Sequence, residues 1–191
     1  MKNTSLTLLT ALAALTATAA FAEPATYAPD PAHTAVIFEA RHFGTSTLRV
    51  RFDKKSGTVT LDKAAKTGKV EMTIDTSSID SGTPAFDKHL KSKDFFNVEA
   101  FPTATFVSDK VLFDGDKVSA VVGTLTLLGK SQTVTLKANN YNCYQNPMLK
   151  REVCGGDFET TVPRSDFGMT NLLAASPNEV RVLIQIEAVK Q

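Results

Sequence analysis

The feature that most constrains this fold is the alternation of apolar and polar residues in short runs. In the run 33–42, Val36, Phe38 and Ala40 share one face, whereas Glu39 and Arg41 lie on the other. A period of two predicts β-strands with one buried and one solvated face. Gly, Asp, Asn and Lys separate the runs and favour turns. So many strands in one short chain predict a mainly β fold, a closed or nearly closed antiparallel sheet.

Further strands are predicted along most of the remaining chain. They cover 48–52, 59–61, 70–75, 104–107, 111–113, 118–128, 133–137, 158–162 and 180–187. Residues 53–57 are predicted to form a hairpin turn within a meander of adjacent strands. Residues 27–31 are rich in Pro and are predicted to be a lead-in to the first strand.

One segment, residues 83 to about 97, has a helical pattern. Thr83-Pro84 resembles an N-cap followed by a first-turn proline, and Asp87 is placed where a helix dipole favours an anion. Phe86 and Leu90 have the spacing of one helical face. We expect this short helical segment to cover one open end of the barrel, because its apolar side chains need a place to be buried.

The first 22 residues have the composition of a cleavable secretory signal. Lys2 is followed by an apolar stretch over 6–20 and then by Ala20-Phe21-Ala22, an Ala-x-Ala cleavage pattern. No later segment has the roughly 20 consecutive apolar residues that a membrane-spanning helix needs. The sequence therefore predicts removal of residues 1–22 and export of residues 23–191 as one soluble domain.

Charge and motifs narrow the function classes. The chain has 21 basic and 20 acidic residues and no basic run, which is not typical of a protein that neutralises nucleic-acid phosphates. It contains no Gly-x-Ser-x-Gly elbow and no His-Glu-x-x-His metal motif. We therefore predict no nucleic-acid partner, no catalytic residue and no enzymatic activity.

The chain has two cysteines, Cys143 and Cys154, in a segment rich in Asn, Gly and Tyr. An exported protein meets an oxidising environment, so a disulfide that staples a long loop is the simplest prediction. Loop-closure entropy gives such a staple about 3 kcal/mol. There is no Cys-x-x-Cys spacing and no nearby His, so no metal site is predicted.

Several separated motifs occur in order along the chain: Asp30-Pro31-x-His33-Thr34-x-Val36-x-Phe38, Arg41-His42-x-Gly44, Asp87-x-His89-Leu90-x-Ser92-x-Asp94-Phe95-Phe96, Phe101-Pro102-x-x-x-Phe106, Gly123-x-Leu125-Thr126-Leu127-x-Gly129 and Arg164-Ser165-Asp166-Phe167-Gly168-Met169. This set resembles the YceI-like family of periplasmic polyisoprenoid-binding proteins across nearly all of residues 23–191. The segment from Cys143 to Cys154 is absent from many members, although a subgroup looks similar there.

The resemblance implies a single lipocalin-like antiparallel β-barrel of about eight strands. Its apolar cavity would hold the chain of an isoprenoid quinone or a similar long-chain lipid, with no covalent cofactor. A periplasmic location, a homodimer and a partnership with a membrane cytochrome of the b type are further expectations from the family.

Two sets of site residues follow. The predicted cavity lining consists of Val36, Phe38, Val50, Phe52, Met72, Ile74, Phe106, Leu125, Leu127, Phe158, Val182 and Ile184. The predicted rim, where polar groups could orient a lipid head group, consists of Arg41, His42, His89, Arg164 and Asp166.

Alternatives remain for the site and for the function. Each lining residue could pack a solid core, and Asp87, Arg164 and Asp166 could form caps and salt links that tie the helical segment and a late loop to the barrel. The protein could also be a lipid-acting enzyme, or a ligand-free interaction or structural module.

Overall fold

The computed structural model describes residues 23–191, and the predicted signal segment 1–22 lies outside the described residues. The strands are β1 (Ala25–Pro29), β2 (Ala35–His42), β3 (Ser46–Phe52), β4 (Lys55–Asp62), β5 (Thr67–Asp75), β6 (Ile79–Asp80), β7 (Thr103–Asp114), β8 (Lys117–Leu127), β9 (Lys130–Asn146), β10 (Arg151–Pro163) and β11 (Glu179–Lys190). The helices are η1 (Thr76–Ser78), α1 (Pro84–Lys91) and η2 (Arg164–Phe167). Among residues 23–191, no helix combines the length and apolar character needed to span a membrane.

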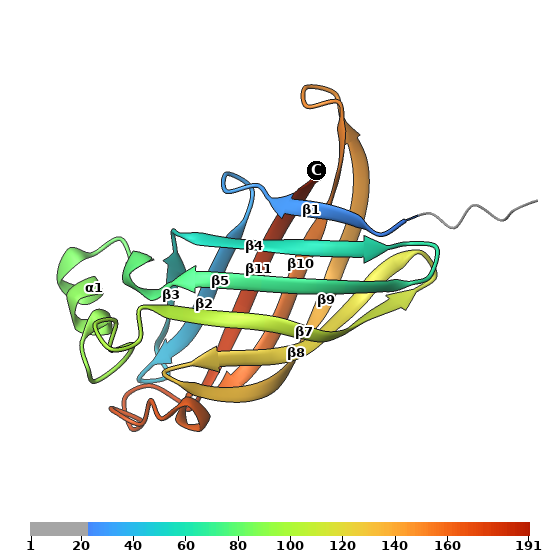
Figure 1. Ribbon diagram of the computed structural model, residues 1–191. Coiled ribbons are helices and arrows are strands. Elements are labelled where there is room, and N and C mark those ends of the chain that lie inside the picture. Colours follow the sequence, from blue (N-terminus) through green and yellow to red (C-terminus); the bar gives the residue numbers. More distant parts are fainter. Residues whose placement is uncertain (1–22) are drawn as a thin grey trace, which may run out of the picture.

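Eight of the strands close into an antiparallel barrel (Figure 1). The order is β1, β4, β5, β7, β8, β9, β10 and β11, and the last strand pairs back with β1. Residues 188–190 of β11 pair with β1, whereas its residues 181–185 pair with β2. β3 then pairs with β2, and β6 pairs with β3, so these strands extend the sheet beyond the closed barrel. The prediction of a mainly β, lipocalin-like barrel is confirmed.

The outer face of this wall is polar, as the alternation predicts. Glu39 of β2 accepts a hydrogen bond from Arg49 of β3, with 2.7 Å between Oε1 and Nε. Its other oxygen lies 3.3 Å from Nη1 of Arg181 on β11, and Arg181 also pairs with Glu159 of β10. These side-chain ion pairs therefore form one network across the four neighbouring strands β3, β2, β11 and β10. Exposed pairs of this kind contribute little each, but they keep this face in water.

The helix α1 lies at one end of the barrel (Figure 1). Pro84 occupies its first turn, where the fixed φ of proline suits a helix. Asp87 accepts hydrogen bonds from the backbone N–H and the hydroxyl of Ser81, at 2.7 and 2.5 Å. Thr83 precedes the helix as predicted, but its side chain makes no capping hydrogen bond. The helix is shorter than the predicted segment, which continues to residue 97 as turns.

The prediction of a hairpin at residues 53–57 is wrong. β3 pairs with β2 and β6, whereas β4 pairs with β1 and β5. The chain instead turns a corner at Asp53, whose backbone N–H donates to the Ser78 carbonyl at 3.0 Å. The turn residues in the sequence predict a change of chain direction, but they do not show that β4 pairs with β1 and β5 and not with β3.

Residues 25–29 form β1, not the predicted lead-in. Pro24 precedes this strand and Pro29 ends it, so neither proline interrupts its middle. Tyr27 at its centre is 1% exposed and pairs with both Val59 and Lys190. This strand therefore completes the barrel.

The segment between the two cysteines is not the predicted long loop. It belongs to the hairpin of β9 and β10, which projects beyond the barrel (Figure 1). The β9–β10 pairing changes register at Asn139, which has no partner between Ala138 and Asn140. Such a bulge shifts which residues face inward, and Asn and Gly are poor strand formers. The alternation was therefore hidden in the sequence.

Candidate functional site

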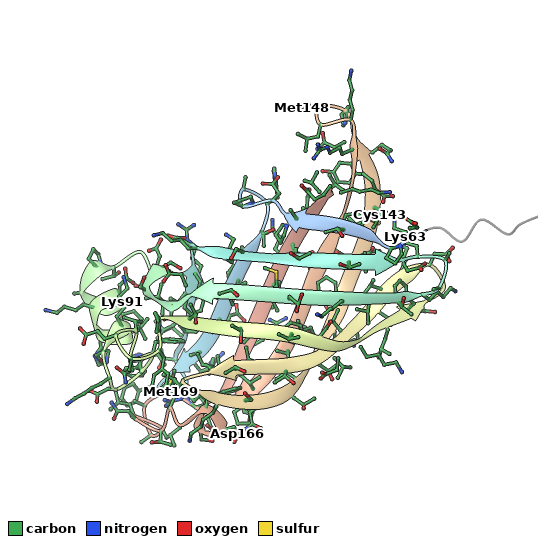
Figure 2. The ribbon with its side chains drawn as sticks, viewed as in Figure 1. Lys63, Lys91, Cys143, Met148, Asp166 and Met169 are labelled. Atoms are coloured by element: carbon green, nitrogen blue, oxygen red, sulfur yellow. A yellow bond between two sulfur atoms is a disulfide. The ribbon has the colours of Figure 1, made fainter. Side chains whose placement is uncertain are left out.

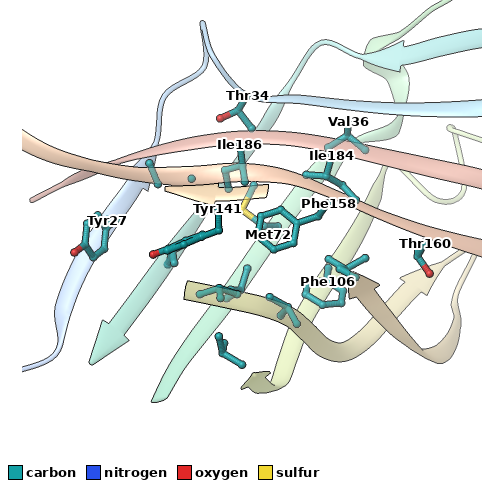
Figure 3. A pocket seen from close by; sticks show the side chains of 18 of the residues that line it. Tyr27, Thr34, Val36, Met72, Phe106, Tyr141, Phe158, Thr160, Ile184 and Ile186 are labelled. Carbon is teal, nitrogen blue, oxygen red and sulfur yellow. The ribbon is translucent and has the colours of Figure 1, made fainter. Parts of the chain in front are cut away.

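Two apolar chambers lie in the barrel interior. The inner chamber has a volume of about 140 Å³ and lies toward β1 and the β9–β10 hairpin (Figure 3). The outer chamber has a volume of about 340 Å³ and lies toward α1 and η2. Val36, Ile74, Leu125 and Val182 line both chambers, so we call these four residues the waist.

Two polar groups of the inner chamber, those of Tyr27 and Thr34, have hydrogen-bond partners. The Tyr27 hydroxyl donates to Glu152 at 2.6 Å, and the Thr34 hydroxyl donates to the Glu187 carbonyl at 3.2 Å. Burial raises the pKa of Tyr141 to about 12, and burial followed by the hydrogen bond to Glu152 raises that of Tyr27. Both phenols therefore stay neutral, and the chamber presents an apolar surface.

Aromatic rings shape the outer chamber. Phe38, Phe52 and Phe96 form a triangle with ring centroids 5.4 to 5.9 Å apart. Phe96 follows α1 in the chain and is 7% exposed, while Leu90 of α1 is 5% exposed. The expectation that the helical segment buries its apolar side chains across an end of the barrel is confirmed.

The structure places every predicted lining residue at a chamber wall. Met72, Phe106, Phe158 and Ile184 line the inner chamber, and the four waist residues line both. The outer chamber takes the others, namely Phe38, Val50, Phe52 and Leu127. Contact of these residues with a ligand stays a prediction.

Sequence reasoning missed other lining residues. Many of them are inward-facing residues of strands that were predicted, so the alternation of apolar and polar residues could have identified them. These residues are Val59, Leu61, Val111, Val118, Val134, Leu136 and Ile186. Others come from the segment around and after η2, where no period exists: Phe167, Met169, Leu172, Ala175 and Ser176.

The predicted rim residues do not form one polar cluster. His42, His89 and Arg164 line the outer chamber, whereas Arg41 and Asp166 do not. His42 stacks edge-on against Phe43, with ring centroids 4.9 Å apart. Arg41 donates to the Gly44 carbonyl at 2.7 Å, and the exposed Asp166 side chain makes no ion pair with residues 23–191. His42, His89 and Arg164 therefore lie at the outer chamber and Arg41 and Asp166 lie outside its lining, while a role of any of the five in orienting a head group stays a prediction.

Arg164 organises the loop that follows η2. Its side chain is buried and donates to the carbonyls of Met169, Asn171, Ser176 and Pro177, at 2.7 to 3.2 Å. The alternative of a salt link is wrong here, because all of these acceptors are backbone carbonyls. Burial lowers the pKa of Arg164 from its ordinary value, although a guanidinium stays charged. Arg164 thus shapes the chamber wall by holding this loop.

The predicted disulfide is present and joins Cys143 of β9 to Cys154 of β10, directly opposite each other. Glu152 lies close to both sulfur atoms, in the kind of cluster that can hold a metal ion. Because the two sulfur atoms are bonded to each other, they are not thiolate ligands. Cys154 also forms part of the inner-chamber wall.

The sequence matches the YceI-like domain family over residues 27–188. Protein YceI of Salmonella arizonae is 37% identical over 160 residues, which is 83% of each chain. Protein YceI of Salmonella enteritidis PT4 has the same identity and coverage.

Solved structures share the fold. BcnA of Burkholderia cenocepacia is 28% identical with a TM-score of 0.69, covering 85% of this chain and 99% of BcnA. The YceI protein of Campylobacter jejuni has a TM-score of 0.68 at 24% identity, covering 79% and 90%. A polyisoprenoid-binding domain of Saccharophagus degradans, implicated in plant cell wall breakdown, has a TM-score of 0.60 at 15% identity, covering 88% and 100%. From the extent of the sequence match and the shared barrel, this chain belongs to the YceI-like family.

Proposed function

We propose that this protein binds one long-chain isoprenoid lipid, such as an isoprenoid quinone, and carries it through an aqueous compartment. The observation that carries the proposal is the pair of apolar chambers that share the waist residues. An extended tail would pass the waist and occupy both chambers, with its head group near His42 and His89 in the outer one.

The physical basis is burial of the tail. Each methylene removed from water gains about 0.8 kcal/mol, so a tail of many carbons needs no strong polar contact. Loss of translational freedom and of tail flexibility limits the net affinity. The wall suits this role, because the phenol groups of Tyr27 and Tyr141 are neutral and Tyr27 is already hydrogen-bonded.

The class of lipid is suggested by the Saccharophagus degradans domain, which is described as polyisoprenoid-binding. At 15% identity that likeness concerns the barrel, so the extension to this chain is our proposal. The quinone head group is our further choice within that class.

We also propose a periplasmic location, reached through the signal segment 1–22 and its Ala-x-Ala site. In that setting a carrier could exchange quinone with a membrane cytochrome of the b type and could act as a homodimer. Co-purification from solubilised membranes and the mass in solution test these two expectations separately.

The two alternative functions have less support. A lipid-acting enzyme would need a reactive group at the chambers, but the histidines there, His42 and His89, contact the rings of Phe43 and Phe95. His33 does bond to a carboxylate, Asp30, at 2.7 Å, but its side chain is 60% exposed. A ligand-free module would not need chambers of this size.

The test is titration of delipidated protein with isoprenoid quinones. We expect saturable binding that raises the melting temperature, because a ligand that binds only the folded state stabilises it. The same quinone head group without a tail should give no shift. Leu127→Glu should abolish binding while circular dichroism shows how much of the variant is folded. Equal shifts with and without the tail would refute burial of the tail.

A further inference from the structure

Three side chains of types that bind metal ions lie together beside the inner chamber. The sulfur atoms of Cys143 and Cys154 and a carboxylate oxygen of Glu152 all lie within 4.8 Å of one another. We call these three residues the sulfur–carboxylate cluster. Cys143 lies at the same end of the barrel as Lys63, far from Met169, which lines the outer chamber (Figure 2). The cluster is therefore separate from the outer chamber and its histidines.

The strand register brings the cluster together. Glu152 and Cys154 are two residues apart on β10, so their side chains leave the same face of the strand. Cys143 of β9 is directly opposite Cys154, with 4.1 Å between the two Cα atoms. Two thiolates bound to one Zn²⁺ at about 2.3 Å lie about 3.7 Å apart, and an opposite pair reaches this separation by turning its side chains. Opening the disulfide therefore leaves both sulfur atoms within reach of one ion.

The carboxylate of the cluster is already oriented. The Tyr27 hydroxyl donates to Oε1 of Glu152 at 2.6 Å, and the Lys63 Nζ lies 2.7 Å from Oε2. Partners of this kind orient the ligands of metal sites in proteins. A carboxylate offers about four lone-pair sites, so the two contacts leave room for an ion. The Glu152 side chain is 22% exposed, so water can also reach that ion.

The charges of the cluster suit a divalent cation. In the disulfide form the Lys63 ammonium balances the Glu152 carboxylate. Two thiolates would add two negative charges beside that pair, which is unfavourable until a divalent ion cancels them. Lys150, Arg151 and Lys190 line a recess with Glu152, but all three are exposed and their charges are screened by water. The ion therefore displaces the two thiol protons when it binds.

We propose that reduction of the disulfide between Cys143 and Cys154 forms a Zn²⁺ site, with the two thiolates and the Glu152 carboxylate as ligands and water in the fourth position. Thiolates select Zn²⁺ or Cu⁺, and the carboxylate favours Zn²⁺. The reductant is a dithiol. One of its thiolates attacks the disulfide to form a mixed disulfide, and its second thiolate then releases the other cysteine. Two electrons and two protons pass to the cysteine pair, and the dithiol becomes a disulfide.

The bound ion restores the cross-link that reduction removes. Zn²⁺ then joins β9 to β10 at the position of the disulfide, where Cys154 also forms part of the inner-chamber wall. The β9–β10 hairpin is cross-linked in the oxidised form by the disulfide and in the reduced form by the metal. Zn²⁺ binding needs no lipid and does not depend on the proposed function.

The test is titration of the reduced protein with Co²⁺, whose thiolate complexes absorb in the near ultraviolet, followed by displacement with Zn²⁺. The protein is reduced with dithiothreitol, which is then removed under nitrogen. We expect saturation at one Co²⁺ per chain and loss of the absorption when Zn²⁺ is added. Zn²⁺ should also raise the melting temperature of the reduced protein, because it binds only the folded state tightly. The oxidised protein should show neither effect.

Single substitutions separate the ligands. Cys143→Ser should lose the thiolate absorption of the paired site, whereas Glu152→Gln should keep it and bind Zn²⁺ about tenfold more weakly or worse. Asp116→Asn is the matched control, since its carboxylate is 100% exposed in the turn between β7 and β8, and it should bind like the wild type. Circular dichroism checks that each variant is folded.

Three results would overturn the proposal. The first is a folded, reduced wild type without thiolate absorption in Co²⁺. The second is equal Zn²⁺ affinity in the wild type and in folded Glu152→Gln, which would exclude the carboxylate as a ligand. The third is a disulfide that dithiothreitol does not reduce in the folded protein.

Discussion

Tyr27 of β1 donates a hydrogen bond to Glu152 of β10, with 2.6 Å between the phenol oxygen and Oε1. Lys63, in the turn after β4, lies 2.7 Å from the other carboxylate oxygen. These contacts join the first strand and the turn after β4 to the β9–β10 hairpin, beside the inner chamber. The wall of the inner chamber at Tyr27 therefore depends on a polar cluster outside it.

Glu152 should make folding stability depend on acid pH. Burial raises its pKa, but the hydrogen bonds from Lys63 and Tyr27 outweigh burial and hold the pKa below the ordinary 4.5. A lowered folded-state pKa contributes stability above the unfolded value that is lost as the pH falls through the folded value. We expect Glu152→Gln to be less stable than wild type at neutral pH and to lose less stability on acidification.

Urea unfolding over a pH series measures this dependence. Asp116→Asn is the control, because the Asp116 side chain is 100% exposed and should leave the pH profile of the wild type unchanged. Parallel profiles for wild type and Glu152→Gln would contradict the role given to Glu152.

Arg164→Lys should loosen the loop 169–177 and its contact with the turn 42–45. A lysine ammonium cannot reach the four carbonyls that the guanidinium bonds, and carbonyls left unsatisfied in the interior cost about 2 to 4 kcal/mol in total. Hydrogen exchange should speed up at the Phe43 amide, whose acceptor is the Ala175 carbonyl. Arg151→Lys, on the exposed hairpin, should change neither quantity. Unchanged exchange at Phe43 in Arg164→Lys would show that the loop is held by other contacts.

Replacing Cys143 and Cys154 together by Ser should lower the free energy of unfolding by up to about 3 kcal/mol, since the loop closed by the disulfide becomes free in the unfolded chain. Wild type treated with a reductant should approach the stability of the double variant. The variant itself should not respond to the reductant. If the double variant has the same melting temperature as the wild type, the strand pairing alone holds the hairpin.

Ile184→Phe should reduce the length of the longest lipid tail that the two chambers can hold. Ile184 lines the inner chamber, which has about 140 Å³, and a larger ring there takes up space needed by the end of a long tail. We expect weaker binding of long isoprenoid tails and unchanged binding of tails short enough for the outer chamber. Val107→Phe on the outer wall, where Val107 is 41% exposed, should bind both alike. Equal loss for short and long tails would argue against two chambers in series.

The alternation of apolar and polar residues correctly predicted which strand residues face the barrel interior. The inward positions of β2, β3, β5 and β11 carry Val36, Val50, Met72 and Val182, and each lies at a chamber wall. Alternation fails where backbone geometry changes it, as at the Asn139 bulge, and it cannot identify which strands become neighbours across the corner at Asp53.

No periodic signal could predict the turn 42–45 or the loop 169–177, because neither is a regular strand or helix. Arg164 was predicted to stand at the rim, but its role in holding backbone carbonyls depends on a loop conformation that no motif encodes. Likewise, Gly44 in the sequence indicates a turn after β2. That the neighbouring Phe43 ring is exposed follows only from the structure.

Direct extraction tests whether the barrel interior holds one long-chain apolar lipid. The protein, purified without detergent from its native compartment, is extracted with organic solvent and the extract is analysed by mass spectrometry. We predict an isoprenoid lipid in a ratio near one per barrel, and none from a folded Leu127→Glu variant purified alongside. An extract of the wild type with no more lipid than that variant would show that the barrel does not carry a lipid.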